Sequence, residues 1–186
     1  MPESDYPMTR AALRLLENCG IETGESQFFS KVVEFRDLCS TWNLSAKLMS
    51  TSDLANRFDA HLADSLSLGP YVAGPGMLPR TLVDIGSGAG FPAIPLCLAL
   101  PGIAAVLVER SEVKSSFLRQ ALSRLGLGSA LVQTANYPHA PLPQGAKVFT
   151  ARAVEKSQNI DTAILKGLRD SDEYLAQRDV SGLTKD

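Results

Sequence analysis

Three glycines at alternate positions mark the part of the chain whose residue types could do chemistry. They are Gly86, Gly88 and Gly90, which follow the apolar run 82–85 and precede an apolar segment with helical spacing. A chain that leaves a buried strand, turns tightly and enters a helix has this pattern, because glycine adopts positive φ and lets a ligand approach the backbone. The helix N-terminus then offers unpaired N–H groups to an electron-rich ligand. The sequence therefore predicts a ligand-binding turn at 86–90.

An acidic residue stands at the end of the next predicted strand. Glu109 follows the apolar run 104–108 and lies 19 residues after Gly90. A carboxylate at this place can accept hydrogen bonds from both hydroxyls of a ribose. The glycine turn and the spaced acid together favour an adenosine-type cofactor.

The residues around the turn distinguish between cofactors. The dinucleotide pattern G-x-G-x-x-G would require glycine at position 91, where the chain has Phe91, and no Lys-Ser/Thr pair follows to make a P-loop. Asp84 lies just before the turn and suits a cationic ligand better than a pyrophosphate. S-adenosylmethionine carries a sulfonium and an ammonium group, so the charges favour this cofactor. A nicotinamide-dependent oxidoreductase is the less favoured alternative.

The other segments are expected to position the turn on a parallel sheet. Apolar residues at helical spacing predict three N-terminal helices, at 8–18, 28–42 and 52–68. Apolar runs after the turn predict strands at 104–108, 130–132 and 147–151. A helix between Ser111 and Gly126 would bury the stripe Val113, Phe117, Ala121, Leu122 and Leu125. Strands that alternate with helices imply parallel pairing, with ligands beyond the carboxyl ends of the strands.

We expect an α/β fold in one compact unit with two regions. Residues 1–72 form an N-terminal helical region, residues 78–186 form a Rossmann-like region, and the Pro/Gly-rich stretch 69–80 links them. After Val154 the pattern weakens: residues 158–168 fit a helix, residues 163–165 fit a short strand, and the end from Arg169 is polar. The sequence thus predicts a shortened C-terminal end and a small sheet.

Composition excludes several classes of protein. The chain of 186 residues has a net charge of −2, which argues against massive non-specific binding to nucleic acid. No apolar run approaches a membrane span, and the acidic N-terminus lacks the order of a signal peptide. Three cysteines without metal-like spacing indicate buried thiols, a cytoplasmic setting and no metal site. The sequence contains no pattern that indicates an oligomeric state.

Two longer motifs resemble a known family. They are V-D-I-G-S-G-A-G-F-P-A-I-P-L at 83–96 and V-E-R-S-E-V-K-S-S-F-L-R at 108–119. Three shorter segments occur in the same order, T-W-N at 41–43, H-L-A-D-S-L at 61–66 and A-R-A at 151–153. Over roughly residues 10–155 the chain resembles the ribosomal RNA small subunit methyltransferase G family, also called glucose-inhibited division protein B.

The resemblance implies a Rossmann-like fold and S-adenosylmethionine-dependent methylation of guanosine N7 in small-subunit (16S) rRNA. Its partner would be 16S rRNA or the small ribosomal subunit. Carried over by position, the expected cofactor-binding residues are Gly86, Gly88, Gly90, Phe91, Glu109, Asn136, Tyr137 and Arg152. Asn136 and Tyr137 would flank the adenine, and Arg152 is the family's arginine after the fourth strand.

The helix at 52–68 carries the candidates for positioning the substrate. Arg57, His61 and Asp64 share one face, which is either a solvated charge stripe or the border of the active cleft. We take His61 and Asp64 as substrate-positioning candidates. Guanine N7 carries no proton, so we assign no acid or base. Candidates for phosphate contacts are Lys47, Arg57, Lys114 and Arg119.

Two residues depart from the family pattern. Lys47 stands at the second asparagine of the W-N-x-x-x-N segment, and Ala135 stands where an arginine is expected. Ala135 and the shortened C-terminal end leave an alternative open, a non-catalytic RNA-binding or ribosome-assembly relative of the methyltransferase.

Overall fold

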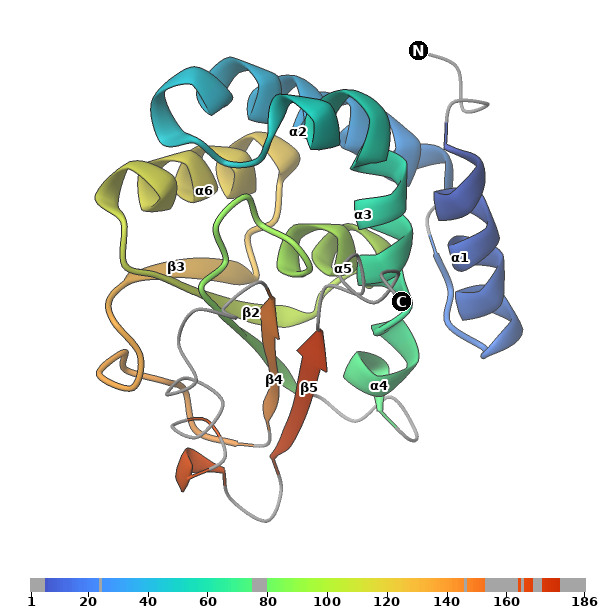
Figure 1. The fold of residues 1–186 in the computed structure, drawn as a ribbon. Coiled ribbons are helices and arrows are strands. Elements are labelled where there is room, and N and C mark those ends of the chain that lie inside the picture. Colours follow the sequence, from blue (N-terminus) through green and yellow to red (C-terminus); the bar gives the residue numbers. More distant parts are fainter. Residues whose placement is uncertain are drawn as a thin grey trace, which may run out of the picture.

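The computed structural model describes residues 6–23, 25–74, 80–145, 147–152, 164, 166–168 and 172–177. The N-terminal part is helical, as predicted, with α1 (Pro7–Asn18), α2 (Glu25–Ala46), the π-helical turn η2 (Asp53–Arg57), α3 (Phe58–Leu66) and α4 (Gly69–Ala73). The carboxylate of Asp59 in α3 accepts hydrogen bonds from Met8 N at 3.0 Å and Thr9 N at 2.9 Å. These bonds satisfy two free N–H groups at the start of α1 and tie α1 to the outside of α3 (Figure 1).

Within the described residues, the second part is a five-stranded sheet in the order β3-β2-β1-β4-β5. Its strands are β1 (Thr81–Ile85), β2 (Ala104–Glu109), β3 (Ala130–Thr134), β4 (Lys147–Arg152) and β5 (Glu173–Gln177). Every neighbouring pair is parallel. Helices α5 (Ala93–Ala99) and α6 (Glu112–Leu125) connect β1 to β2 and β2 to β3. The expected α/β, Rossmann-like architecture is confirmed.

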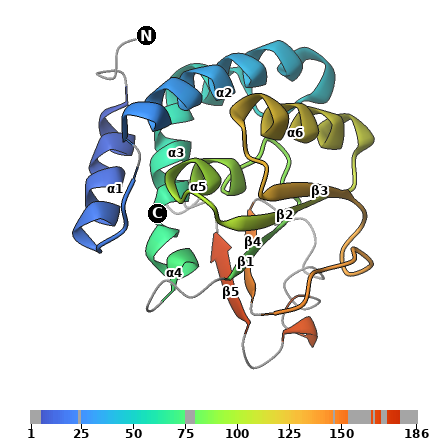
Figure 2. The same cartoon turned by 180° about the vertical axis from the view of Figure 1, so that it is seen from behind.

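The two faces of the sheet are covered differently. Figures 1 and 2 show α2, α3, α5 and α6 gathered on one side, with α1 outermost. One apolar cluster joins Leu82, Leu107 and Val148 of the strands to these helices. A second, smaller cluster on the other face contains Val83, Val106, Phe149 and Ile164. Successive strand residues therefore point to opposite faces. Because the first cluster spans both parts of the chain, the boundary between regions 1–72 and 78–186 stays a prediction.

Helix α6 begins and ends as its sequence predicts. Ser111 is its N-cap and accepts a hydrogen bond from Lys114 N, and Gly126 ends it in the left-handed conformation at φ 72°. Four of the five residues of its predicted stripe are buried, but Val113 is 46% exposed, so that part of the prediction is wrong. Val113 lies in the first turn of α6, at the rim of the helical layer.

Some C-terminal and linker predictions are also wrong. Residues 69–73 form α4, with Pro70 in the first turn, where its missing N–H is tolerated. Strand β5 lies in the polar segment after Arg169, where the sequence predicted no strand. Its Tyr174 packs on one cluster and Leu175 on the other. Residue 164 is helical, which contradicts a strand at 163–165. Residues 178–186 lie outside the described residues.

The cysteine prediction holds for two of the three thiols. Cys39 and Cys97 are buried, and burial raises the pKa of each to about 12. Cys19 is exposed just after α1, contrary to expectation. Among the described helices, none is both long and apolar enough to cross a membrane.

Candidate functional site

Strand alternation places four polar side chains on the helical face of the sheet at its carboxyl end. Leu82, Leu107 and Val148 face the helices. Residues two positions apart on a strand point to the same face. Asp84 in β1 and Glu109 in β2 therefore also face the helices, as do Thr150 and Arg152 in β4. Three strands thus direct polar groups to one place beside the glycine turn, where parallel sheets bind ligands.

The glycine turn has the backbone conformation that its composition predicts. Gly86, Gly88 and Gly90 have φ of 74°, 53° and 89°. Gly86 N donates to the carbonyl of Val108 in β2 at 2.8 Å, and Gly90 N donates to Ser87 O at 2.6 Å. A Cβ on Gly90 would lie 2.5 Å from Ile94 Cδ1, whereas a Cβ on Gly88 would meet nothing nearer than Gly86 O at 3.6 Å. Gly90 is therefore needed for packing, and Gly88 faces space that a ligand can enter.

Glu109 organises the turn from the neighbouring strand. Its Oε2 accepts a hydrogen bond from Gly88 N at 3.0 Å, and its Oε1 accepts one from Ser111 N at 2.8 Å. The side chain is buried. Each carboxylate oxygen has a further acceptor site. The structure thus gives Glu109 an architectural role, and the predicted contact with ribose hydroxyls would use its remaining lone pairs.

Asp84 is a buried carboxyl group that is only half satisfied. It is 1% exposed, and Thr150 Oγ1 donates to its Oδ1 at 2.8 Å. Its Oδ2 has no hydrogen-bond partner among the described residues. Burial raises the pKa of Asp84 to about 7. A buried carboxylate oxygen without a partner is costly, so it marks a place where a cationic or donor group would be stabilised.

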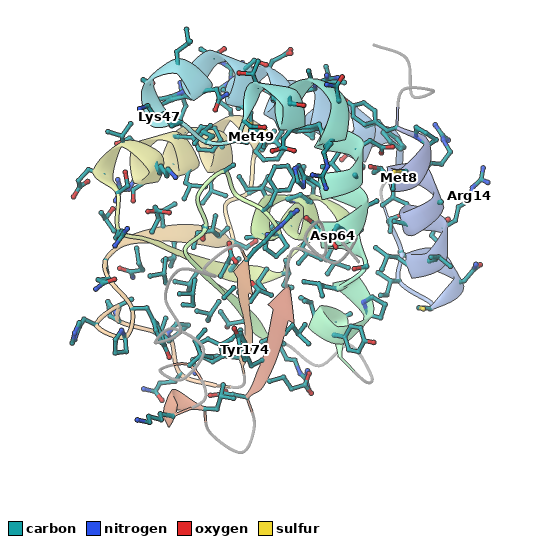
Figure 3. The ribbon with its side chains drawn as sticks, in the orientation of Figure 1. Met8, Arg14, Lys47, Met49, Asp64 and Tyr174 are labelled. Carbon is teal, nitrogen blue, oxygen red and sulfur yellow. The ribbon has the colours of Figure 1, made fainter. Side chains whose placement is uncertain are left out.

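Arg152 joins the strand end to helix α3. Its Nη2 is hydrogen-bonded to His61 Nδ1 and lies 3.4 Å from Asp64 Oδ2. Its guanidinium carbon lies 5.9 Å from the centroid of the Phe91 ring. Its Nη1 is buried and has no partner within the described part of the chain. In Figure 3, Asp64 projects from α3 beside the upper ends of β4 and β5.

His61 is held as a neutral ring. Burial lowers the pKa of His61, and the charge of Arg152 lowers it further. Since the arginine can only donate, Nδ1 is the acceptor and the proton is on Nε2. Nε2 lies 3.8 Å from Asp53 Oδ1 in η2. On this helix face His61 and Asp64 therefore contact Arg152 at the end of β4, and their role in positioning a substrate stays a prediction. Arg57 is exposed and pairs with Asp53 at 3.6 Å.

Phe91 is part of the core. It is 7% exposed, and its ring packs against Phe35 at 5.3 Å, Phe58 at 5.5 Å and His61 at 5.7 Å between ring centroids. The ring connects the glycine turn to α2 and α3. Its predicted contact with the cofactor would therefore involve mainly its backbone.

Asn136 and Tyr137 follow β3 at the same end of the sheet. Asn136 is exposed, and its carbonyl accepts a hydrogen bond from His139 N at 2.9 Å. Tyr137 packs against Phe149 in the cluster on the other face of the sheet, with 6.4 Å between centroids. Of this pair, the exposed Asn136 is the residue whose side chain is free to approach an adenine.

The prediction missed two residues that complete the site, Thr150 and Asp53. Thr150 was predicted at the carboxyl end of a strand, where the strand ends converge, but was given no role in the site, although a hydroxyl at the end of a buried strand is a signal in itself. Asp53 was predicted as a helix start, and its proximity to His61 depends on the extra residue in the π-helical turn.

An open groove lies at the other end of the sheet. It has a volume of about 860 Å³ and is lined by the α1–α2 turn, the end of α4 and residues 100–104. These residues lie at the amino ends of β1 and β2. The groove contains none of the polar side chains gathered around the glycine turn, so we place the chemistry at the turn.

Solved structures with a similar fold are methyltransferases. Protein-L-isoaspartate O-methyltransferase aligns with a TM-score of 0.54 at 10% identity, over 94% of this chain and 56% of that one. The mitomycin 7-O-methyltransferase MmcR aligns with a TM-score of 0.51 at 22% identity, over 76% and 42%. At these identities the likeness concerns the fold alone, which is the Rossmann-like fold of S-adenosylmethionine-dependent methyltransferases.

The sequence comparison is more specific. Residues 29–181 match the family described as rRNA small subunit methyltransferase G, and the chain belongs to this family. It is 33% identical over 141 residues to the ribosomal RNA small subunit methyltransferase G of Nitrosomonas europaea, covering 76% of this chain and 63% of that protein. The protein of the same name from Xanthomonas campestris pv. campestris (strain B100) is 33% identical over 131 residues, which are 70% of this chain and 59% of that protein. The chain thus spans about three fifths of the length of these relatives.

Proposed function

We propose that the protein transfers the methyl group of S-adenosylmethionine to N7 of a guanosine in small-subunit (16S) rRNA. Family membership and the methyltransferase fold support an rRNA methyltransferase. The feature that carries the proposal is a pair of buried atoms beside the glycine turn, Asp84 Oδ2 and Arg152 Nη1, which have no hydrogen-bond partner among the described residues.

These two atoms fit the chemistry of the cofactor. The methionine part of S-adenosylmethionine has an ammonium group and a carboxylate. Asp84 Oδ2 can accept a hydrogen bond from the ammonium group, and Arg152 Nη1 can donate one to the carboxylate. Gly88 leaves open space at the turn. The proposed cofactor-binding residues are therefore Gly86, Gly88, Gly90, Phe91, Glu109, Asn136, Tyr137 and Arg152, with Asp84 added.

The residues around Arg152 hold it in place. His61 Nδ1 accepts a hydrogen bond from the guanidinium, Asp64 provides a negatively charged partner and the Phe91 ring lies close to it. In this account His61 is a positioning residue that fixes Arg152. Asp64 is the most exposed member of the group, with a side-chain exposure of 51%, so it is the one best placed to meet a guanosine.

The proposed reaction requires no general base in this protein. S-adenosylmethionine supplies an electrophilic methyl group on its sulfonium sulfur. Guanine N7 has a lone pair and no proton, so nothing must be removed before it attacks. The protein has to bind both partners and align them, which makes the step effectively unimolecular. The absence of an assigned acid or base is therefore consistent with the proposed chemistry.

A methyl-transfer assay on small ribosomal subunits and naked 16S rRNA tests the proposal. Radioactive methyl should appear at N7 of a guanosine with the wild-type protein. Gly88→Asp is the matched control, because aspartate tolerates positive φ and its side chain would fill the ligand space without a clash. A folded wild-type protein that binds rRNA but transfers no methyl group would refute the enzyme and favour a non-catalytic assembly factor.

A further inference from the structure

Lys47 has an unusual backbone conformation for its residue type. Its φ is 47°, and it is the one non-glycine residue with positive φ in the part of the chain that the structure describes. Left-handed backbone is unfavourable for residues with a Cβ, and asparagine or glycine tolerates it best. A lysine kept at such a place suggests that its side chain has a use that outweighs the strain.

The neighbouring residues, rather than the lysine side chain, fix this conformation. Asn43 Oδ1 accepts hydrogen bonds from Leu48 N at 2.9 Å and Met49 N at 3.1 Å, and Asn43 O accepts one from Lys47 N at 3.1 Å. Leu48 is buried and Met49 packs against the main core. The side chain of Lys47 itself is exposed. It therefore projects from a turn whose backbone is held on both sides.

The turn lies at the same end of the molecule as the candidate site. Helix α2 runs antiparallel to α6, because Lys31 near the start of α2 reaches the carbonyl of Arg124, and Trp42 near its end packs on Phe117 with 6.2 Å between centroids. The end of α2 is thus beside the first half of α6. Helix α6 starts three residues after Glu109, at the carboxyl end of β2.

Three cations at this end have neither an ion pair nor a side-chain hydrogen bond among the described residues, whereas Arg119 is hydrogen-bonded to Thr134 Oγ1. They are Lys47, Arg110 just after β2, and Lys114 in the first turn of α6. Other cations in this layer are already engaged, since Arg57 pairs with Asp53 and Arg124 with Glu34. Glu112 is exposed in the first turn of α6 and reduces the net positive charge of this surface. Free cations beside a site suit the phosphates of a nucleic acid.

We propose that Lys47 contacts a backbone phosphate of the rRNA and, with Arg110 and Lys114, orients the RNA over the glycine turn. This inference rests on the proposed rRNA substrate. The strained backbone at Lys47 directs one cation outward from a rigid turn, and this geometry separates it from an ordinary surface lysine.

The test compares Lys47→Asn with wild type in two measurements. Asparagine suits the left-handed backbone, so the melting temperature should stay equal or rise by roughly 1–4 °C. Binding to unmodified 16S rRNA should weaken by about fivefold to tenfold at 0.1 M salt. The negative slope of log K against log salt concentration should become shallower by roughly 0.7–0.9, as expected when one phosphate contact is lost. Lys47→Arg keeps the charge and should retain the wild-type slope.

Arg14→Gln is the control, because it removes an exposed cation from α1 on the opposite side of the molecule (Figure 3). Its slope should equal that of wild type. If Lys47→Asn binds 16S rRNA with the wild-type affinity and slope, this inference is wrong while the proposed function stands. If the wild-type protein shows neither binding nor methylation of 16S rRNA, the proposed function itself fails.

Discussion

Gly90 is the residue of the turn at which packing and backbone conformation can be tested together. Its φ is 89°, and an added Cβ would lie 2.5 Å from Ile94 Cδ1, 2.9 Å from Ile94 Cγ1 and 3.4 Å from Leu118 Cδ2. Ile94 is fully buried in α5 and Leu118 fully buried in α6, so neither can move away freely. Gly90→Ala should therefore strain the turn and overpack the core.

The expected cost has two parts. Left-handed backbone costs an alanine about 1–2 kcal/mol. Overpacking of a dense core typically costs about 1–3 kcal/mol. The sum of about 2–5 kcal/mol corresponds to a fall in melting temperature of roughly 5–15 °C for a chain of this length.

Gly126→Ala is the matched control for the backbone part alone. Gly126 has a φ of 72°, lies at the end of α6 away from the turn, and has no atom within 4 Å of an added Cβ. Thermal and urea unfolding followed by circular dichroism should show a loss of about 1–2 kcal/mol for this variant. If Gly90→Ala costs no more than Gly126→Ala, the turn does not pack tightly against α5 and α6.

Three further predictions concern the site. Arg152→Ala should weaken binding of S-adenosylhomocysteine about 10- to 100-fold in a calorimetric titration, because one charged hydrogen bond is lost; unchanged binding would remove Arg152 from the site. Asp84 has a folded-state pKa of about 7, above its ordinary value of 3.8, so its contribution to the free energy of unfolding should fall as pH rises from about 4 to 7. Urea titrations should show that Asp84→Asn lacks this fall, and identical pH profiles would contradict the burial of an unsatisfied carboxyl group. Phe91→Ala should lower the free energy of unfolding by about 3–5 kcal/mol, since it empties the space between Phe35 and Phe58. A melting temperature equal to that of wild type would show that the ring is not in the core.

Local signals made the central part of the fold predictable. Gly86, Gly88 and Gly90 need positive φ, and Ser111 and Gly126 delimit α6 by their capping chemistry. These properties depend on a few neighbouring residues and can be read from the sequence. The proximity of Asp84 and Glu109 to the turn also follows, because parallel strands bring their carboxyl ends together.

Other features depend on tertiary packing and could not be predicted. Strand β5 pairs with β4 at the edge of the sheet, and among its described side chains Tyr174 and Leu175 pack on the two clusters, so its apolar run is short. The ring of Phe91 packs on α2 and α3, and Tyr137 packs on the other face of the sheet. The contact of Arg152 with His61 joins residues 91 positions apart. The spacing of residues along the sequence does not show toward which distant element a side chain will pack.

The claim that most needs testing is that the glycine turn binds S-adenosylmethionine. Isothermal titration of the full chain with S-adenosylmethionine and with S-adenosylhomocysteine tests it most directly, with Gly88→Asp as the non-binding control. We predict one site per chain for both ligands and none for the variant. No binding of either ligand to the folded wild-type protein, by calorimetry and by equilibrium dialysis, would contradict the account.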